Sequence, residues 1–310
     1  MSKKLDFSKP LVVLAPLAGY TDLPFRSVVK KFGADVTISE MISSNALVYK
    51  SARTLKMVEK SPSEDPYFVQ IAGNKPELVR EAVEILNDVE GIDGIDLNCG
   101  CPAPKVFNHG SGSNLLGDLK KLEEILSTVK KYSKKEFTSA KVRIGVNEKI
   151  PVEIGKAVEA CGVDFVSVHG RTRAGKYKAP VDYEAIRQLK AAVSIPVIAN
   201  GDIKDYAKAK EVLEYTKADG VMIGRGAIGK PWVFYQLKHQ IEDISNDIKK
   251  EIILEHYDKM IEYHGDFGAI IFRKLLHAYS KGYTGANEFR DLVNRVTDVK
   301  VMRDLIESFF

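Results

Sequence analysis

The chain has 310 residues, of which 45% are apolar and 28% charged, a composition typical of a soluble globular protein with one large domain or one domain and a smaller appendage. Its net charge of +4 permits a polyanionic partner without requiring one, and its three cysteines are too few for a disulfide framework. The polar N-terminal segment MSKKLDFSKP predicts no signal peptide, and the lack of any run of about 18 apolar residues predicts no membrane span, so we expect a cytoplasmic protein.

Short apolar runs with the character of buried strands recur along the first three quarters of the chain. They are Leu11–Leu17, Asp35–Met41, Tyr67–Gly73, Gly94–Gly100, Ser139–Gly145, Phe165–Gly170, Ile195–Gly201 and Gly220–Gly226. Their continuous apolarity is typical of strands that are covered on both faces. The pattern therefore predicts a parallel α/β sheet rather than an exposed antiparallel one.

Amphipathic stretches at helical spacing lie between these runs. They are Pro76–Val89, Leu119–Val129, Pro151–Ala160, Tyr183–Ala192, Lys204–Tyr215 and Pro231–Ile241. Eight strand–helix units in about 240 residues predict a (β/α)₈ TIM barrel. An open doubly wound sheet is the alternative, and the absence of G-x-G-x-x-G after the first strand disfavours it.

The pattern changes after Ile244, where the polar stretch SNDIKKEI leads into helices with no further strand-like run. We expect helices at Glu251–His264, Phe267–Lys281 and Asn287–Ser308, separated by glycines. The chain is therefore predicted to form a TIM-barrel domain over residues 1–244 and a small all-helical domain over residues 245–310.

The most informative motif is GIDLNCGCPAPKV, residues 94–106, in which a strand ends and Cys101 follows between Gly100 and Pro102. A core cysteine would more often lie inside the apolar run, so this thiol is placed to act on a ligand. The active site of a TIM barrel lies at the carboxyl ends of its strands. Other polar residues that this fold brings there are Gln70, Asn98, Lys141, His169, Asn200, Asp202 and Arg225.

Two of these residues allow more than one interpretation. A buried lysine is costly without a polar or charged partner, so Lys141 either has one or points outward at a strand edge. His169 fits a hydrogen-bonded core histidine as well as it fits a ligand contact.

The last two predicted strands end in IPVIANGDI and GVMIGRGAIG. Their glycines let backbone N–H groups approach an anion, and Arg225 adds a charged fork at the usual phosphate site of this fold. We expect a phosphate-bearing ligand there, although such turns also end strands for steric reasons alone. After the first strand, Pro16, Ala18 and Gly19 leave room for a flat ligand, or mark only a strand–helix junction with Thr21 or Asp22 as its cap.

A basic loop, RTRAGKYKAP, follows the sixth predicted strand. Four cations and Tyr177 suit a nucleic-acid backbone and a stacked base, and the alternative is a solvated charge run. The cations are Arg171, Arg173, Lys176 and Lys178. In the helical region Arg273, Lys274, His277 and Lys281 could share one helix face. Cys99 and Cys101 form C-x-C without zinc spacing, so we expect no metal site, and we expect Cys99 and Cys161 to be buried thiols.

Taken together, these motifs resemble the tRNA-dihydrouridine synthase family of flavoenzymes, and most closely its bacterial B branch. The similarity runs in order through PLAGYTDLPFR, YFVQIAG, GIDLNCGCPAPKV, KVRIG, VHGRTR, IPVIANGDI and MIGRG, and less specifically through FRKLLHAYSKGYTG in the helical region. Two positions depart from the family pattern: Leu17 stands where Met is usual, and Asn114 stands where a small apolar residue is common.

The resemblance implies FMN as bound cofactor, NADPH as reductant and tRNA as partner. It implies that Cys101 is catalytic and that Asn98 and His169 lie near the target base or the flavin. It also implies flavin contacts from Pro16, Leu17, Ala18, Gln70, Lys141, Asn200, Gly201, Asp202, Gly224 and Arg225. The basic residues that we expect to contact tRNA are Arg171, Arg173, Lys176, Arg273, Lys274 and Lys281.

The implied reaction is reduction of the C5–C6 double bond of a D-loop uridine, with hydride from flavin N5 to C6 and a proton from Cys101 to C5. An ordinary thiol is protonated at neutral pH and can donate without an activating base. Lys141 would stabilise the reduced ring, and the uridine would enter flipped out of its stack. A flavin-dependent barrel acting on a free pyrimidine and a non-catalytic tRNA-binding protein are the alternatives. We expect a monomer, because tRNA needs a long open surface.

Overall fold

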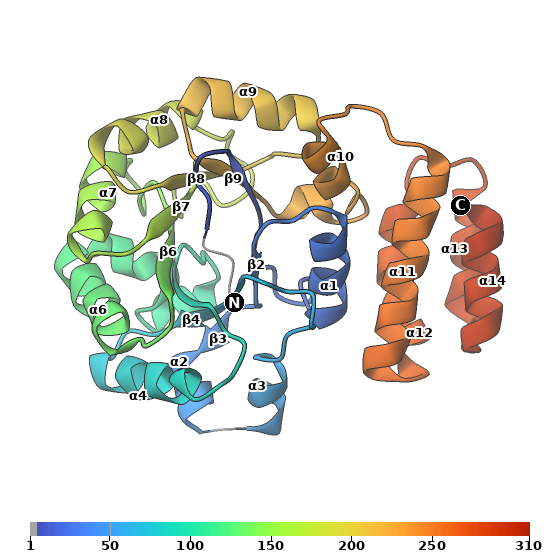
Figure 1. Ribbon diagram of the computed structural model, residues 1–310, viewed down its shortest axis with the longest axis horizontal. Helices are drawn as coiled ribbons and strands as arrows, with labels where there is room; N and C mark the ends of the chain where they lie inside the picture. The colour runs from blue at the N-terminus through green and yellow to red at the C-terminus, as the bar shows by residue number, and fades with distance from the viewer. Residues whose placement is uncertain (1–4, 50) are drawn as a thin grey trace.

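The computed structural model describes residues 5–49 and 51–310, and within them the chain forms an eight-stranded parallel barrel with a helical bundle at its side (Figure 1). The first four residues of the polar N-terminal segment, in which we expected no signal peptide, lie outside the described residues. No helix in the described part of the chain is long and apolar enough to cross a membrane.

The strands follow one another around the barrel in chain order. Parallel pairing runs through the order β1-β9-β8-β7-β6-β5-β4-β2, and a bridge between Val13 and Val36 joins the two ends of this path. The strands are β1 (Leu11–Leu14), β2 (Thr37–Ile38), β4 (Tyr67–Ala72), β5 (Gly94–Cys99), β6 (Phe137–Arg143), β7 (Phe165–His169), β8 (Val197–Asn200) and β9 (Gly220–Ile223). The predicted (β/α)₈ barrel is therefore confirmed.

The second predicted strand is shorter than expected. Within Asp35–Met41 only the two residues of β2 pair as a strand, and the chain then adds β3 (Ile42–Ser43) on the edge of β4 before entering α2 (Ser44–Val48). The apolar run did not reveal this early end of the strand, because Ser39 is buried although it lies beyond β2.

Helices surround the barrel in the predicted alternation. They are α1 (Leu23–Phe32), α3 (Ala52–Lys56), α4 (Pro76–Asn87), α5 (Pro104–Asn108), α6 (Leu119–Tyr132), α7 (Pro151–Ala160), α8 (Tyr183–Ala192), α9 (Tyr206–Thr216) and α10 (Val233–His239). Aspartates start several of them: Asp22, Asp118, Asp182 and Asp205 each accept a hydrogen bond from a backbone N–H in the first turn of the helix that follows.

Each barrel strand has an apolar face toward the helices and an inner face toward the barrel axis. The inner face is apolar at one end, where Val13, Ile38, Phe68, Phe165 and Met222 pack in one cluster. A much larger cluster fills the space between the strands and the helices. Two apolar layers account for the continuous apolarity of the strand sequences.

The C-terminal region is a bundle of α11 (Asn246–His264), α12 (Phe267–Tyr279), α13 (Ala286–Arg295) and α14 (Val299–Phe309). The expectation of one helix over Asn287–Ser308 was wrong. Val296 is extended, and the side chain of Asp298 accepts hydrogen bonds from the N–H groups of Lys300 and Val301, so a second helix starts there.

The bundle shares its apolar core with the barrel. Val28 and Phe32 of α1 and Trp232 pack with the buried side chains of α11 and α12, and α11 lies alongside α1 (Figure 1). Ser245 caps α11, so the polar linker is short. The division into residues 1–244 and 245–310 stays a prediction, and the shared core indicates that the bundle is firmly docked.

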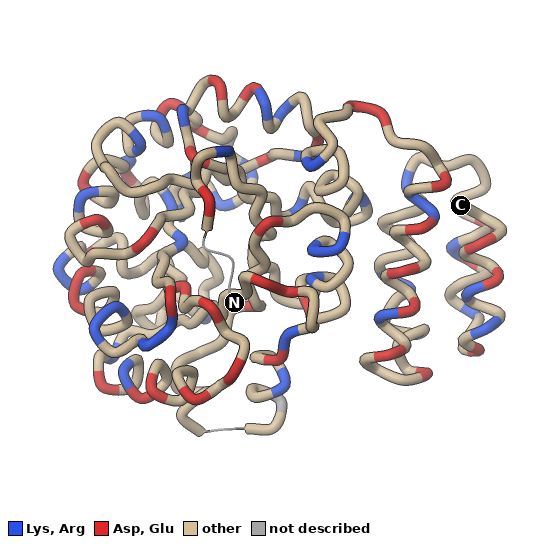
Figure 2. The backbone as a smooth tube through the Cα atoms, viewed as in Figure 1, with Lys and Arg blue, Asp and Glu red and all other residues tan. Residues whose placement is uncertain are grey.

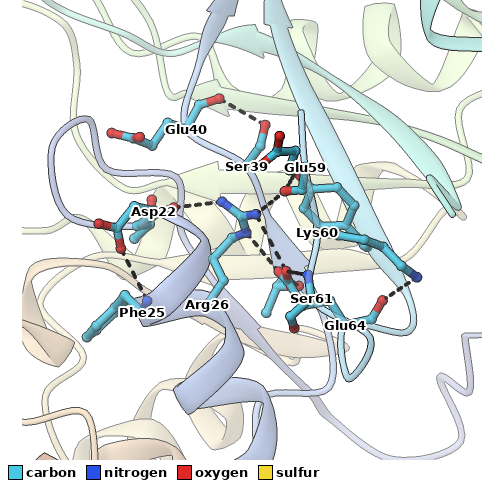
Figure 3. Close-up of polar contacts among 12 residues, drawn as sticks. Asp22, Phe25, Arg26, Ser39, Glu40, Glu59, Lys60, Ser61 and Glu64 are labelled. Carbon is cyan, nitrogen blue, oxygen red and sulfur yellow. Dashed lines mark hydrogen bonds and ion pairs between the residues drawn. The ribbon is translucent and has the colours of Figure 1, made fainter. Parts of the chain in front are cut away.

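A buried ion pair ties α1 to the segment that follows α3 (Figure 3). Arg26 and Glu64 are 2% and 0% exposed, and Arg26 Nε donates to Glu64 Oε1 over 2.7 Å. Thr37 Oγ1 and the Ser61 N–H also donate to the carboxylate of Glu64, while the guanidinium donates to the carbonyls of Thr21 and Glu59. Both charges are thus hydrogen-bonded on all sides.

We expect Glu64→Ala to lower the free energy of unfolding by about 3–5 kcal/mol, because Arg26 would remain buried without its counter-ion. Urea unfolding measures this change. Glu184→Ala is the control: it removes the exposed carboxylate that pairs with Arg187 and accepts from Gln188 and Tyr215, and it should lower the free energy of unfolding far less than Glu64→Ala does. A loss as small as that of the control would mean that water or another group neutralises Arg26.

Candidate active site

A cavity of about 220 Å³ opens at the carboxyl ends of the barrel strands. Every residue predicted to be catalytic or to contact the cofactor lines it, together with Asn98. These are Pro16, Leu17, Ala18, Gln70, Asn98, Cys101, Lys141, His169, Asn200, Gly201, Asp202, Gly224 and Arg225. The structure thus brings together residues that are spread over more than 200 positions of the sequence.

Strand register explains this convergence. Asn98 lies opposite Lys141 in the β5–β6 pair, and His169 lies opposite both Arg143 and Asn200 in the next pairs. Because side chains alternate along a strand, these residues share the inner face with the apolar cluster below them. The apolar layer fills the barrel, and the polar layer above it forms the cavity.

A chain of hydrogen bonds leads from a buried carboxylate to the backbone of Cys101. Ser139 Oγ and Gln70 Nε2 donate to Asp96 over 2.7 and 2.6 Å, and Asn98 Nδ2 donates to Gln70 Oε1 over 2.7 Å. Asn98 Oδ1 then accepts from the Cys101 N–H over 2.9 Å. An ionised carboxylate only accepts, so Asp96 sets the orientation of both amides and leaves the Asn98 oxygen facing the cysteine loop.

Asp96 belongs to the site although it was not among the predicted residues. It is 0% exposed, and burial raises its pKa to about 6 against the opposing effect of the hydrogen bonds from Gln70 and Ser139. Its position two residues before Asn98 on β5 was the available signal, because it places Asp96 on the same inner face.

Lys141 points into the cavity, so the alternative of an outward-pointing side chain was wrong. Its Nζ donates to Asn200 Oδ1 over 3.2 Å, and Asn200 Nδ2 donates to the Met222 carbonyl. Burial and the neighbouring Arg143 lower the pKa of Lys141 to about 8, against the opposing charge of Asp96. The ammonium group is thus charged at neutral pH but only weakly solvated.

His169 is neutral. Burial, followed by the charges of Lys141 and Arg143, holds its pKa far below the ordinary range. Arg171 can only donate, so the 3.3 Å contact from Arg171 makes His169 Nε2 an acceptor and puts the ring proton on Nδ1. The histidine therefore lines the cavity as an uncharged hydrogen-bonding group.

Arg171 does not lie on the exposed surface of the basic loop, where we expected it. Its side chain is 3% exposed and forms a bidentate pair with Asp202, which also accepts from Arg225 over 3.1 Å. The hydrogen bond from Arg171 lowers the pKa of Asp202. The Arg225 guanidinium stacks on Tyr177, with 4.4 Å between its central carbon and the ring centroid. Arg171 therefore links the basic loop to Asp202 and, through it, to Arg225.

Arg143 is a second residue that sequence reasoning missed. It is 1% exposed, its Nε donates to the Gly100 carbonyl over 2.8 Å, and its Nη1 donates to the carbonyls of Thr172 and Lys176. It thereby joins the cysteine loop to the basic loop. The alternation of Lys141 and Arg143 in KVRIG was the signal, because it puts both on the inner face.

Lys and Arg are interspersed with Asp and Glu over both the barrel and the bundle (Figure 2), and the remaining basic residues of the prediction lie in different places. Lys176 and Lys178 are exposed, and Arg173 packs over the Phe107 ring at 3.9 Å. In the bundle, Lys274 Nζ donates to the Gly19 carbonyl, whereas Arg273 donates to the Val296 carbonyl. Arg273 and Lys274 therefore face different neighbours, and Lys281 lies beyond the end of α12. The expectation that these basic residues share one helix face was wrong.

Cys99 and Cys161 are buried as expected, and Cys101 is partly exposed at the cavity. The Cys101 carbonyl accepts hydrogen bonds from the N–H and the hydroxyl of Ser113, which closes the loop after the cysteine. Within residues 5–49 and 51–310 no group of three or more His, Cys, Asp or Glu side chains is arranged to hold a metal ion.

The fold and the site define a (β/α)₈ barrel that holds a thiol, a buried ammonium group and an arginine-rich rim in one cavity. The chain matches the dihydrouridine synthase (Dus) family over residues 13–309 and belongs to that family. A probable tRNA-dihydrouridine synthase of Helicobacter pylori is 54% identical over 99% of this chain and 94% of its own length. A tRNA-dihydrouridine synthase B of Vibrio parahaemolyticus is 38% identical over 96% of this chain and 95% of its own.

Solved structures with little sequence similarity share the barrel fold. Histamine dehydrogenase from Rhizobium sp. 4-9 superposes with a TM-score of 0.59 at 12% identity, covering 80% of this chain and 48% of its own. The old yellow enzyme from Trypanosoma cruzi superposes with a TM-score of 0.53 at 11% identity, covering 74% of this chain and 88% of its own. At such identities the likeness is one of fold alone.

We expect Lys141→Met to raise the free energy of unfolding of the flavin-free protein at pH 7 by about 1–3 kcal/mol, because a buried charge is replaced by an apolar chain of similar length. The unfolded chain keeps the Lys141 proton up to about pH 10.5, whereas the folded chain keeps it only to about pH 8. The cost of the buried charge is thus complete below pH 8 and declines between pH 8 and 10.5.

Urea unfolding of both proteins at pH 7 and pH 9.5 measures this difference, which should shrink at the higher pH. A variant that is less stable than the parent at pH 7 would show that the bond to Asn200 outweighs the desolvation of the charge.

Proposed function

We propose that this protein is a tRNA-dihydrouridine synthase, which binds FMN, takes electrons from NADPH and reduces the C5–C6 double bond of a D-loop uridine. The observation that carries the proposal is the position of Cys101 on the rim of a cavity that also holds Lys141 and Arg225. Family membership and relatives that carry this name over nearly their whole length support it.

The residues of the cavity fit a flavin. Pro16, Leu17 and Met222 offer apolar contacts to a flat ring, and the amides of Gln70 and Asn200 offer polar ones. The Gly224–Arg225–Gly226 turn offers a guanidinium and backbone N–H groups to a phosphate. When bound there, the flavin supplies the hydride for C6 of the uracil ring.

Cys101 would donate the proton that C5 needs when hydride adds to C6. The Asn98 oxygen and Ser113 hold the backbone of Cys101 from both sides, so the thiol is presented by a fixed loop. Lys141 would stabilise negative charge that develops in the cavity, because its ammonium group is charged at neutral pH and poorly hydrated. His169 would contribute hydrogen bonding without adding charge.

The exposed cations beside the cavity would receive the RNA. Lys176, Lys178 and Tyr177 project from the loop after β7, and Arg173 lies above Phe107 of α5. Of the cations in the bundle, we retain Arg273, Lys274 and Lys281 as proposed tRNA contacts. Arg171 would act indirectly, by fixing Asp202 and the loop.

We also propose NADPH rather than NADH as the reductant, a monomeric protein and a cytoplasmic location, all from the family. A flavin-dependent enzyme for a free pyrimidine is the first rival, and the exposed cations and the docked bundle argue against it because a small substrate needs neither. A non-catalytic tRNA-binding protein is the second rival, and it has no use for a thiol at the cavity rim.

A visible absorption spectrum tests the proposal. We expect flavin bands that bleach with NADPH and recover under anaerobic conditions only when tRNA lacking dihydrouridine is added. Recovery with free uracil or orotate would instead assign a free-pyrimidine enzyme, and protein that binds no FMN would contradict the flavoenzyme.

We expect Cys101→Ala to lower the rate of tRNA reduction by about 100-fold or more, since a positioned general acid contributes about 10²–10⁴. Bleaching of the flavin bands by NADPH should stay within about twofold, because that step needs no proton from the thiol. Stopped-flow absorbance separates the two steps. Cys161→Ala, which removes a buried thiol far along the sequence, is the control. Normal tRNA reduction by Cys101→Ala would remove the cysteine from the mechanism.

We expect Lys176→Ala/Lys178→Ala to raise KM for tRNA about tenfold. The slope of the logarithm of tRNA affinity against the logarithm of salt concentration should fall by the equivalent of about one phosphate contact for each lysine. Flavin content should not change, because both side chains are exposed. Filter binding at several salt concentrations measures the slope. Loss of flavin instead of tRNA affinity would mean that the loop serves the cofactor.

A further inference from the structure

A second cavity, of about 590 Å³, lies beside the active site and is not part of the site described above. Its walls come from the β3–α2 junction, the turn between β4 and α4, and the loop that follows Cys101. Met41 lines both cavities, so the two adjoin. We call the second one the side cavity.

The side cavity is positive. Lys75, Lys105 and His109 line it, and no carboxylate is among the described residues that do so. Glu77 of α4 is exposed nearby in the sequence but does not line the cavity. His109 Nδ1 hydrogen-bonds to the Lys105 carbonyl, which can only accept, so Nδ1 carries the proton and Nε2 is left for a further contact.

Two hydroxyls at the walls of the side cavity lack hydrogen-bond partners. Ser44 is 1% exposed and Ser111 is 9% exposed, and within the described residues no group hydrogen-bonds either side-chain oxygen. Ser44 is held close to Gly73, where a Cβ atom would come within 2.5 Å of its hydroxyl oxygen. Neither oxygen is among the buried side-chain atoms of the described residues that lack a partner, so both are accessible from the side cavity and free to hydrogen-bond to water or to a polar ligand there.

We propose that the side cavity binds a backbone phosphate of the substrate RNA next to the nucleotide that Cys101 protonates; this inference rests on the proposed function. Two ammonium groups and two free hydroxyls offer several donors at once, which suits the oxygen-rich phosphate group. The position favours RNA as its source, because Lys105 and His109 follow Cys101 by only a few residues and the cavity adjoins the place where the base enters.

The side cavity offers charged and neutral hydrogen-bond donors, and the two kinds should affect the salt dependence of tRNA affinity differently. The lysines contribute charge, so their removal releases fewer counter-ions on binding and flattens the dependence of affinity on salt. Ser44 contributes a neutral hydrogen bond, so its removal weakens binding equally at all salt concentrations.

The test uses FMN-loaded holoenzyme, tRNA lacking dihydrouridine and NADPH. We expect Lys75→Ala/Lys105→Ala to raise KM for tRNA about tenfold. The slope of the logarithm of tRNA affinity against the logarithm of salt concentration, here called the salt slope, should fall by an amount equivalent to about two phosphate contacts. KM for NADPH, the rate of flavin bleaching and flavin content should stay within twofold. Ser44→Ala should raise KM for tRNA about threefold with an unchanged salt slope. Lys156→Ala/Lys210→Ala makes the same change in charge at exposed positions on α7 and α9 and should leave KM for tRNA unchanged.

The outcomes separate the inference from the proposed function. If the parent protein reduces tRNA and the Lys75/Lys105 variant has the same KM and salt slope as the control variant, the phosphate site is wrong and the function stands. A rise in KM for NADPH alone would assign the side cavity to the dinucleotide and overturn the RNA proposal. If the parent protein does not reduce tRNA at all, the proposed function fails first.

Discussion

The active site depends on one constraint, the closure of parallel strands with a side-chain period of two into a barrel. Closure gives every strand an inner face, and the common direction of the strands brings their carboxyl ends to one rim. Along β4, Phe68 fills the interior while Gln70 reaches the rim, and Phe165 and His169 of β7 repeat this order. A shift of one residue in any strand would exchange its polar and apolar faces, so the core and the site stabilise the same register.

The rim of the cavity carries more positive than negative charge. Arg143 and Arg171 are buried and Lys141 is partly exposed in the cavity, and the carboxylates close to these three cations are Asp96 and Asp202. Arg143 donates to carbonyl oxygens and lies over the Tyr177 ring, and none of these contacts neutralises its charge. His169 stays neutral and therefore adds nothing to the excess. A rim with surplus positive charge stabilises anionic ligands, which suits the proposed FMN and tRNA because both carry phosphate.

Sequence reasoning located the barrel and the residues that line its cavity because both follow from short patterns: apolar runs, strand-ending glycines and one exceptional cysteine. It missed Asp96 and Arg143 because each lies inside a run assigned to the core, and only the strand alternation around Asn98 and Lys141 distinguishes them. It assigned Arg171 to tRNA contact because a loop of four cations around an aromatic residue suits a nucleic-acid backbone. The pairing of Arg171 with Asp202 depends on a contact between two loops that are 31 positions apart, which no local pattern contains.

The helical bundle contacts the active-site rim directly, which gives it a part in the geometry of the site beyond any part in binding RNA. Lys274 of α12 donates to the Gly19 carbonyl and lies over the Tyr20 ring, while the Gly19 N–H donates to Glu40. This turn directly follows Pro16–Ala18, which form part of the cavity wall. Because α11 and α12 share a core with α1, the bundle cannot shift without disturbing that turn. Docking of the bundle and the shape of the cavity are therefore linked. RNA that contacts both the bundle and the barrel would bind a surface whose position relative to the cavity is already fixed.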